Sequence, residues 1–171
     1  VAAQELLREA VNIESLEPLR RWNTGKLKRL ENAFQGLKIT SLTGLENWDM
    51  SSVDNMTSLF VQCTNLTDIS AASNWNIRNV TKLSGVFHNC TNLTDISAVS
   101  NWNTSNVKEM INLFQATKIT DLTPLSNWDV SSVTTMKYIF YQCKQITSLA
   151  PLSNWNTSSL TNLNNAFAQL Q

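Results

Sequence analysis

One pattern of apolar residues occurs six times along the 171-residue chain. It is clearest in Ile119–Phe140, ITDLTPLSNWDVSSVTTMKYIF, where four apolar residues spaced three apart precede four at offsets of 0, 3, 6 and 7. All six tryptophans and all six phenylalanines of the chain lie in this pattern, and successive tryptophans are 26 or 27 residues apart. Since a unit of this size cannot bury its apolar face alone, the units are expected to stack into a solenoid with one continuous core.

The repeats divide the chain into two parts. Residues 13–171 are predicted to form the six-unit solenoid, and residues 1–12 an N-terminal capping helix, because AAQELLREAV at 2–11 is amphipathic. The chain begins with Val1, which suggests a fragment of a longer protein. Only AQLQ follows Phe167, so the apolar residues of the last unit are expected to be partly uncovered and to favour end-to-end self-association; these are Leu160, Leu163 and Phe167.

Each unit is predicted to contain a short parallel strand and a helix or helical turn, which gives an α/β solenoid. The strand is placed over LTDIS, as at 66–70 and 93–97. The helix is placed after the tryptophan, where Ser51 and Asp54 have the spacing of a capping box. Apolar residues three apart do not alternate as strand residues do, so 3₁₀ turns are the alternative for the first arm.

Composition excludes several functions. Charged residues make up 15% of the chain, the net charge is zero, and no basic run occurs, which argues against nucleic-acid and anionic-membrane binding. No apolar stretch is long enough to insert into a membrane. The only histidine, His88, lies at a variable position without a second catalytic group, so no enzyme activity and no cofactor are expected.

Several residue types recur at equivalent positions of the units, and most are expected to have structural roles. The tryptophans are expected to form a buried structural ladder; they are Trp22, Trp48, Trp75, Trp102, Trp128 and Trp155. The asparagine that precedes the tryptophan in units 2 to 6 is expected to satisfy backbone groups inside the coil. The three cysteines are predicted to be free and buried, since an odd number at equivalent positions argues against disulfides; they are Cys63, Cys90 and Cys143.

Three aspartates, Asp68, Asp95 and Asp121, occupy the same position in successive units. Carboxylates about 5 Å apart repel one another unless they are hydrogen-bonded or neutralised. A calcium ion could bridge them, because it prefers oxygen ligands. The favoured alternative is that each accepts hydrogen bonds from neighbouring threonine or backbone groups, so that no metal site is present.

Positions that vary between units indicate where a partner would bind. Residues directly after the phenylalanine, and those on the outer side of the predicted helix, carry diverse apolar and aromatic side chains on a uniform scaffold. Repeat proteins commonly bind protein through such a surface. The candidate partner-binding residues are Val61, His88, Ile111, Tyr138 and Tyr141.

The unit W-D/N-x-S-x-V-x-x-M-x-x-L/I-F-x-x-C resembles the BspA-like leucine-rich-repeat surface proteins and the related mycoplasma lipoprotein repeat. The match is best at 48–69 and 128–149, and the ITDLTPL segment is similar to the internalin repeat. Units 1, 4 and 6 lack the cysteine, and units 1, 3 and 6 have leucine in place of methionine. The resemblance implies a right-handed leucine-rich-repeat-like solenoid, displayed extracellularly on the bacterial cell surface and adhesive toward host proteins or other cells.

Two functions are therefore considered for the chain. The first is a non-catalytic surface module that binds a protein or cell-surface ligand in adhesion. The second is a structural spacer that presents another domain and has no ligand of its own. Tyr138 and Tyr141 favour the first, because a spacer needs only solubility at its exposed positions.

Overall fold

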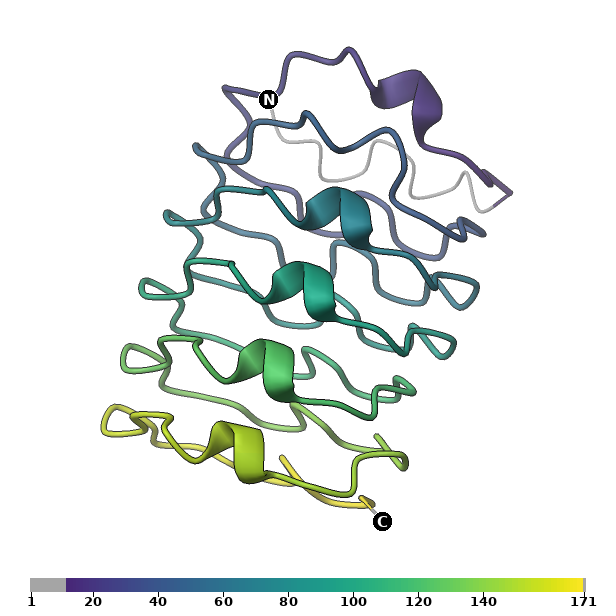
Figure 1. The fold of residues 1–171 in the computed structure, drawn as a ribbon. Helices are drawn as coiled ribbons and strands as arrows, with labels where there is room; N and C mark the ends of the chain where they lie inside the picture. The colour runs from purple at the N-terminus through teal and green to yellow at the C-terminus, as the bar shows by residue number, and fades with distance from the viewer. Residues whose placement is uncertain (1–11, 171) are drawn as a thin grey trace.

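The computed structural model describes residues 12–170, in which the chain winds into six stacked coils (Figure 1). One residue from each coil takes part in a continuous series of parallel β-bridges, in the order Arg29, Asn55, Lys82, Glu109, Thr135 and Asn162. The six units of the sequence pattern thus correspond to six coils with one shared core. The predicted capping helix over residues 1–12 lies, except for Asn12, outside the described residues.

Regular helical structure in residues 12–170 consists of five 3₁₀ helices of three residues each. They all end three residues before a tryptophan, and four of them form a column along one side of the stack (Figure 1). Their bounds are η1, Glu17–Leu19; η2, Ser70–Ala72; η3, Ser97–Val99; η4, Thr123–Leu125; and η5, Ala150–Leu152. The equivalent side of every coil, including that of coil 2, which has no 3₁₀ helix here, is called the η arm below.

The strand predicted over LTDIS was wrong, and the 3₁₀ alternative is confirmed. Helix η2 begins at Ser70, inside the expected strand, and the arm contributes a single bridge, between Ser41 and Asp68. The carboxylate of Asp68 accepts a hydrogen bond from the Ser70 backbone N–H at 2.8 Å, which turns the chain into the helix. Three residues per 3₁₀ turn place apolar residues that are three apart on one side, and this explains the spacing.

The helix predicted after each tryptophan was also wrong. Ser51 and Asp54 form no capping box: the Asp54 backbone N–H donates to the Lys28 carbonyl of the preceding coil at 2.8 Å. Ser58 and Gln62 have φ angles of 57° and 62°, which interrupt any right-handed helix. An α-helix would need these backbone groups for bonds four residues apart, and here they bond to neighbouring coils instead.

This segment is the ladder that joins the coils. In coil 2 the N–H groups of Met56, Ser58, Phe60 and Gln62 donate to carbonyls of coil 3 at 2.8–3.0 Å. Equivalent residues make the same four bonds at every junction between coils. All of these bonds run in one direction, from an N–H group to a carbonyl of the following coil. The ladder therefore fixes the register of each coil on the next.

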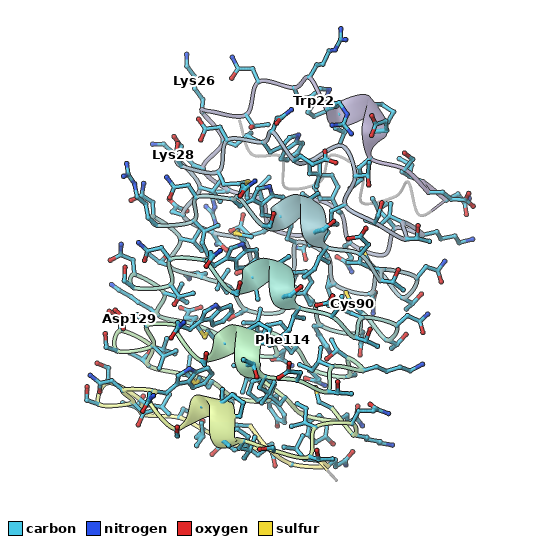
Figure 2. The ribbon with its side chains drawn as sticks, in the orientation of Figure 1. Trp22, Lys26, Lys28, Cys90, Phe114 and Asp129 are labelled. Carbon is cyan, nitrogen blue, oxygen red and sulfur yellow. The ribbon has the colours of Figure 1, made fainter. Side chains whose placement is uncertain are left out.

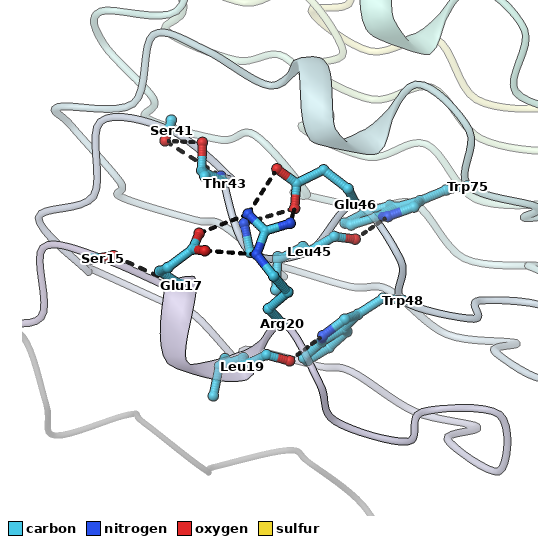
Figure 3. Close-up of polar contacts among 11 residues, drawn as sticks. Ser15, Glu17, Leu19, Arg20, Ser41, Thr43, Leu45, Glu46, Trp48 and Trp75 are labelled. Atoms are coloured by element: carbon cyan, nitrogen blue, oxygen red, sulfur yellow. Dashed lines mark hydrogen bonds and ion pairs between the residues drawn. The ribbon is translucent and has the colours of Figure 1, made fainter.

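Aromatic side chains fill the interior beneath this ladder. The six phenylalanines form a continuous stack with ring centroids 5.6–6.1 Å apart. Trp48, Trp75, Trp102 and Trp128 are each only 4% exposed, whereas Trp22 is 45% exposed. The indole Nε1 of Trp48 donates to the Leu19 carbonyl of the preceding coil, as Figure 3 shows. The four inner tryptophans thus belong to the core, as expected. The prediction was wrong for Trp22, which lies in the first coil at one end of the stack (Figure 2), and Trp155 of the last coil is only partly buried.

The side chain that accepts a backbone hydrogen bond in each unit follows the tryptophan, whereas the asparagine before the tryptophan was predicted to have this role. Asn47 and its equivalents are exposed and make no side-chain hydrogen bond within the described part of the chain. The next side chain after the tryptophan, Asn or Asp in every unit, accepts a hydrogen bond from the backbone N–H two residues later. In coil 5, for example, the Asp129 carboxylate accepts from the Ser131 N–H at 2.9 Å.

Candidate interaction face

The outward side chains of the ladder form one continuous surface across all six coils, called the ladder face here. It consists of the outward-facing side chains in segments 29–35, 55–61, 82–88, 109–115, 135–141 and 162–168. The inward side chains of the same segments supply the core. This arrangement makes the backbone uniform and leaves the outward positions free to vary between coils.

An open groove of about 530 Å³ lies on the ladder face over coils 1 to 4. Gly85 is one of the residues that line it, has a φ of 66° and occupies the position of Ser58 in coil 2 and Asn112 in coil 4. A Cβ atom at Gly85 would lie 3.0 Å from the Ser58 Oγ. The Ser58 hydroxyl therefore already lies beside the space that a side chain at Gly85 would fill, and Gly85 contributes only backbone to the lining of the groove.

Charges in the groove are arranged in opposite pairs. The Arg29 guanidinium pairs with the Glu31 carboxylate, which also accepts a hydrogen bond from the Asn55 amide. Lys82 lies 3.4 Å from Glu109 in the next coil, and both side chains remain partly exposed. Because these pairs cancel, the groove is polar without being strongly basic or acidic, and it offers no field to attract a polyanion.

His88 lines the same groove and is half-buried. Burial lowers the pKa of its imidazole, so the side chain is neutral at pH 7. Tyr138 and Tyr141 lie further along the face, in coil 5, with ring centroids 5.5 Å apart and an interplanar angle of 81°. Gln169 of coil 6 donates a hydrogen bond to the Tyr141 hydroxyl at 3.1 Å.

The five residues predicted to bind a partner all lie in ladder segments, though not all are accessible. His88, Ile111, Tyr138 and Tyr141 are partly exposed, whereas Val61 is only 8% exposed and belongs to the core. His88 and Ile111 line the groove, and the two tyrosines lie in the next coil beyond it. Val61 is therefore a poor candidate for direct contact with a partner.

Sequence reasoning missed the groove that Gly85 lines and the charge pairs. The available signal was the position ten residues after the tryptophan, where coil 3 has glycine and the other coils have larger residues. Its meaning depends on the local backbone, since this position has a positive φ in every coil. A helical interpretation of the segment hides that requirement.

The three aligned aspartates serve the η arm. Each accepts a backbone hydrogen bond at 2.8 Å from the residue two positions later: Asp68 from Ser70, Asp95 from Ser97, and Asp121 from Thr123. Hydrogen bonds from the following hydroxyl residue and its backbone lower the pKa of Asp68 and Asp121. Within residues 12–170 no group of three or more His, Cys, Asp or Glu side chains is placed to hold a metal ion.

The cysteines are free and buried, as predicted. Each thiol donates to the carbonyl of the phenylalanine in the preceding coil, as Cys90 does to Phe60 at 3.2 Å. Burial raises the pKa of the Cys63 thiol to about 12. These thiols are therefore protonated core groups at neutral pH and not nucleophiles.

The family comparison covers nearly the whole chain. A family model described as "Mycoplasma protein of unknown function, DUF285" matches residues 3–97 and 62–171. The chain belongs to this family. Membership of DUF285 agrees with the resemblance of the repeat to mycoplasma sequences and with the sixfold repetition of the chain.

The other comparisons of the DUF285 chain with known proteins found only a distant similarity. A solved structure of internalin C2 from Listeria monocytogenes is 17% identical, with a TM-score of 0.39, over 89% of this chain and 77% of the internalin chain. No curated protein matches the sequence. Among the described residues there is no helix of the length and apolarity that crossing a membrane requires.

Proposed function

We propose that this chain is a non-catalytic, BspA-like module of the bacterial cell surface that binds a protein partner in adhesion. The ladder face is the binding surface, and its groove and tyrosine pair make the contacts. The observation that carries the proposal is that the groove over coils 1 to 4 and the partly exposed pair Tyr138–Tyr141 lie on the same face of the stack.

The residue types on this face suit protein recognition. Protein-binding surfaces in antibodies are rich in Tyr, Ser, Gly and Asn, because tyrosine gives rigid amphipathic contact area and the small polar residues give adaptable hydrogen bonds. The same four types alone occupy the position ten residues after each tryptophan, which is Asn32, Ser58, Gly85, Asn112, Tyr138 and Asn165. Five coil-to-coil steps of about 4.8 Å make the face roughly 24 Å long.

Adhesion by fluorescent beads coated with the purified chain tests this proposal. Beads carrying the wild-type chain are expected to be retained on cultured animal cells, and trypsin treatment of the cells should remove that retention. The double variant Gly85→Asn, Tyr138→Asn should lower retention at least tenfold. Thr94→Ala, at an exposed position on the η arm, serves as the control and should be retained like wild type.

Three outcomes would contradict the proposal. Equal retention of wild type and the ladder-face variant would exclude this face as the binding surface. Absence of retention for every protein would instead favour a spacer that holds another domain away from the cell. Retention that survives trypsin but is lost after periodate oxidation of the cell surface would identify the partner as a glycan and not a protein.

A further inference from the structure

His88 is the only histidine of the chain, and its imidazole makes no hydrogen bond within residues 12–170. The side chain is half-buried and lines the groove over coils 1 to 4. A neutral imidazole has one nitrogen that donates a hydrogen bond and one that accepts. Both nitrogens of His88 are therefore available to a partner that docks in the groove.

The residue three positions before His88 explains why the imidazole has no partner. In coil 4 the equivalent residues are Asn112 and Gln115, and their side-chain amides are hydrogen-bonded to each other. In coil 5 the equivalent residues are the tyrosine pair, whose rings are in contact. In coil 3 the first residue is Gly85, which has no side chain, so only the backbones meet: the His88 N–H donates to the Gly85 carbonyl at 3.1 Å.

The charged side chains that line the groove are already paired with one another. Arg29 and Glu31 of coil 1 form one ion pair, and Lys82 of coil 3 and Glu109 of coil 4 form the other. Coil 2 contributes only neutral side chains to the lining. The lining thus has no net charge while His88 is neutral. Protonation of His88 adds a positive charge for which the groove has no separate carboxylate.

Docking of a partner would oppose that charge further, because it removes water from the groove. Burial disfavours the charged form of histidine and already lowers the pKa of His88 in the free chain. A docked partner buries the ring more deeply, so the pKa of His88 is lower in the complex than in the free chain. Binding linked to such a group is at full strength above the free-chain pKa and weakens as the pH falls through it.

Resting on the proposed function, we infer that His88 makes partner binding at the ladder face sensitive to pH. The chain holds its protein partner at neutral pH and releases it in mildly acidic surroundings. The neutral imidazole contacts the partner in the groove, and the imidazolium opposes docking because it would be buried without a counter-ion.

Retention of coated beads on cultured animal cells at pH 7.5 and pH 5.5 tests this inference. Retention of the wild-type chain is expected to be lower at pH 5.5 by about threefold or more. His88→Gln should be retained equally at the two pH values, whatever its level, because glutamine does not titrate. Glutamine is the matched replacement, since Gln35 and Gln115 occupy this position in coils 1 and 4. Thr94→Ala should show the same ratio as wild type.

The single histidine also permits an independent measurement. NMR signals of the imidazole C–H groups give the pKa of His88 in the free chain, which is expected below the ordinary histidine value of about 6.5. The pH at which half of the wild-type retention is lost should coincide with this pKa. This comparison decides the matter even where His88→Gln is not retained at any pH. Circular dichroism at both pH values confirms that the chains are folded.

Several results would overturn the inference. Equal losses of retention for wild type and His88→Gln between pH 7.5 and pH 5.5 would do so, as would unchanged retention of wild type. Stronger retention of wild type at pH 5.5 would show that the partner supplies a carboxylate to the imidazolium, which reverses the expected dependence. Each of these results, together with retention that depends on the ladder face, leaves the proposed function intact. Absence of retention for every protein at pH 7.5 would remove the proposed function and this inference with it.

Discussion

The indole Nε1 of Trp102 donates a hydrogen bond to the backbone carbonyl of Ala72, 3.0 Å away in the preceding coil. Ala72 is the last residue of η2, so the bond joins the tryptophan of one coil to the 3₁₀ helix of the coil before it. An indole-to-carbonyl bond of this kind recurs at every junction between coils. At four of the five junctions the acceptor is the last residue of a 3₁₀ helix, whereas Trp75 donates to Leu45 of coil 2, which has no such helix. The tryptophan thus combines apolar burial with a directional bond, which helps to explain why no other residue replaces it in any unit.

Substitutions at Trp102 should separate these two contributions. Trp102→Ala is expected to lower the free energy of unfolding by about 3–5 kcal/mol, because it removes a buried ring and leaves a cavity. Trp102→Phe should cost less, about 1–2 kcal/mol, since it keeps an aromatic ring but loses the hydrogen bond and some volume. Urea denaturation measures both values. A Phe variant as unstable as the Ala variant would show that the ring itself contributes little.

The thiols should react slowly in the folded chain. Burial raises the pKa of Cys63, Cys90 and Cys143, so the reactive thiolate is rare at pH 8 and reagents must wait for local opening. Labelling with a chromogenic disulfide reagent should detect three thiols only after denaturation. Cys90→Thr is the matched control and should remain folded, because coil 4 has Thr117 at this position. A Cys63–Cys90 disulfide in the mass spectrum would contradict the prediction.

The sequence allowed prediction of the stacking but not of the local backbone. The repeated tryptophans and phenylalanines determine which side chains face inward, and this is independent of secondary structure. Apolar residues at offsets of 0, 3, 6 and 7 fit an α-helix as well as the observed turns, so the pattern alone does not separate them. The deciding residues are Ser58 and Gln62, whose positive φ values arise from bonds to the next coil. Those bonds join residues 26 apart or more, and local propensity does not include them.

The candidate site was predictable only in part, for the same reason. The tyrosines were identified because they are aromatic residues at variable positions, and that argument requires no backbone geometry. Gly85 was missed because the groove that it lines exists only when coils 1 to 4 are stacked. Val61 was selected for its position after phenylalanine, although its side chain is covered in the stack.

Asp129 should tolerate asparagine but not alanine. Its carboxylate accepts hydrogen bonds from the hydroxyl and the backbone N–H of Ser131, an arrangement that Asn preserves and that Asn103 already uses in coil 4. Asp129→Ala should lower the free energy of unfolding by about 1 kcal/mol, as loss of a capping residue does, and Asp129→Asn by much less. Thermal unfolding at pH 7 distinguishes them, and equal losses would contradict this role.

The same carboxylate predicts a pH dependence. The hydrogen bonds from Ser131 lower the pKa of Asp129 in the folded chain. Its contribution to stability is therefore complete above the pKa of the unfolded chain and is lost as the pH falls below about 4 toward the folded value. Asp129→Asn should consequently lose less stability than wild type between pH 5 and about pH 2. An identical acid dependence of the two proteins would show that Asp129 contributes nothing to it.

Equivalent leucines in the middle and at the end of the stack should differ in their effect. Leu83 in coil 3 is fully buried, whereas Leu163 in coil 6 is 43% exposed, which confirms the expected uncovering of the last unit in this chain. Leu83→Ala should lower the free energy of unfolding by about 2–5 kcal/mol. Leu163→Ala should cost less than about 1 kcal/mol, because little apolar area is lost. Urea denaturation measures the free energy of unfolding of both variants. Equal losses of free energy would contradict the conclusion that the core is less buried in coil 6 than in coil 3.

Tyr138→Asn should make the chain more stable. Tyr138 has a φ of 58°, and the left-handed region costs an ordinary residue about 1–2 kcal/mol, whereas asparagine tolerates it. Loss of the contact with Tyr141 offsets part of this gain, because an exposed aromatic pair contributes about 0.5–1.5 kcal/mol. Tyr141→Ala is the control, since it removes the same ring contact without relieving the backbone. The midpoints of these two ranges give a net gain of about 0.5 kcal/mol in the free energy of unfolding for Tyr138→Asn, and a loss is expected for Tyr141→Ala. Natural proteins keep residues that lower stability where function requires them. A Tyr138→Asn variant less stable than Tyr141→Ala would show that Tyr138 is held for packing and not for binding.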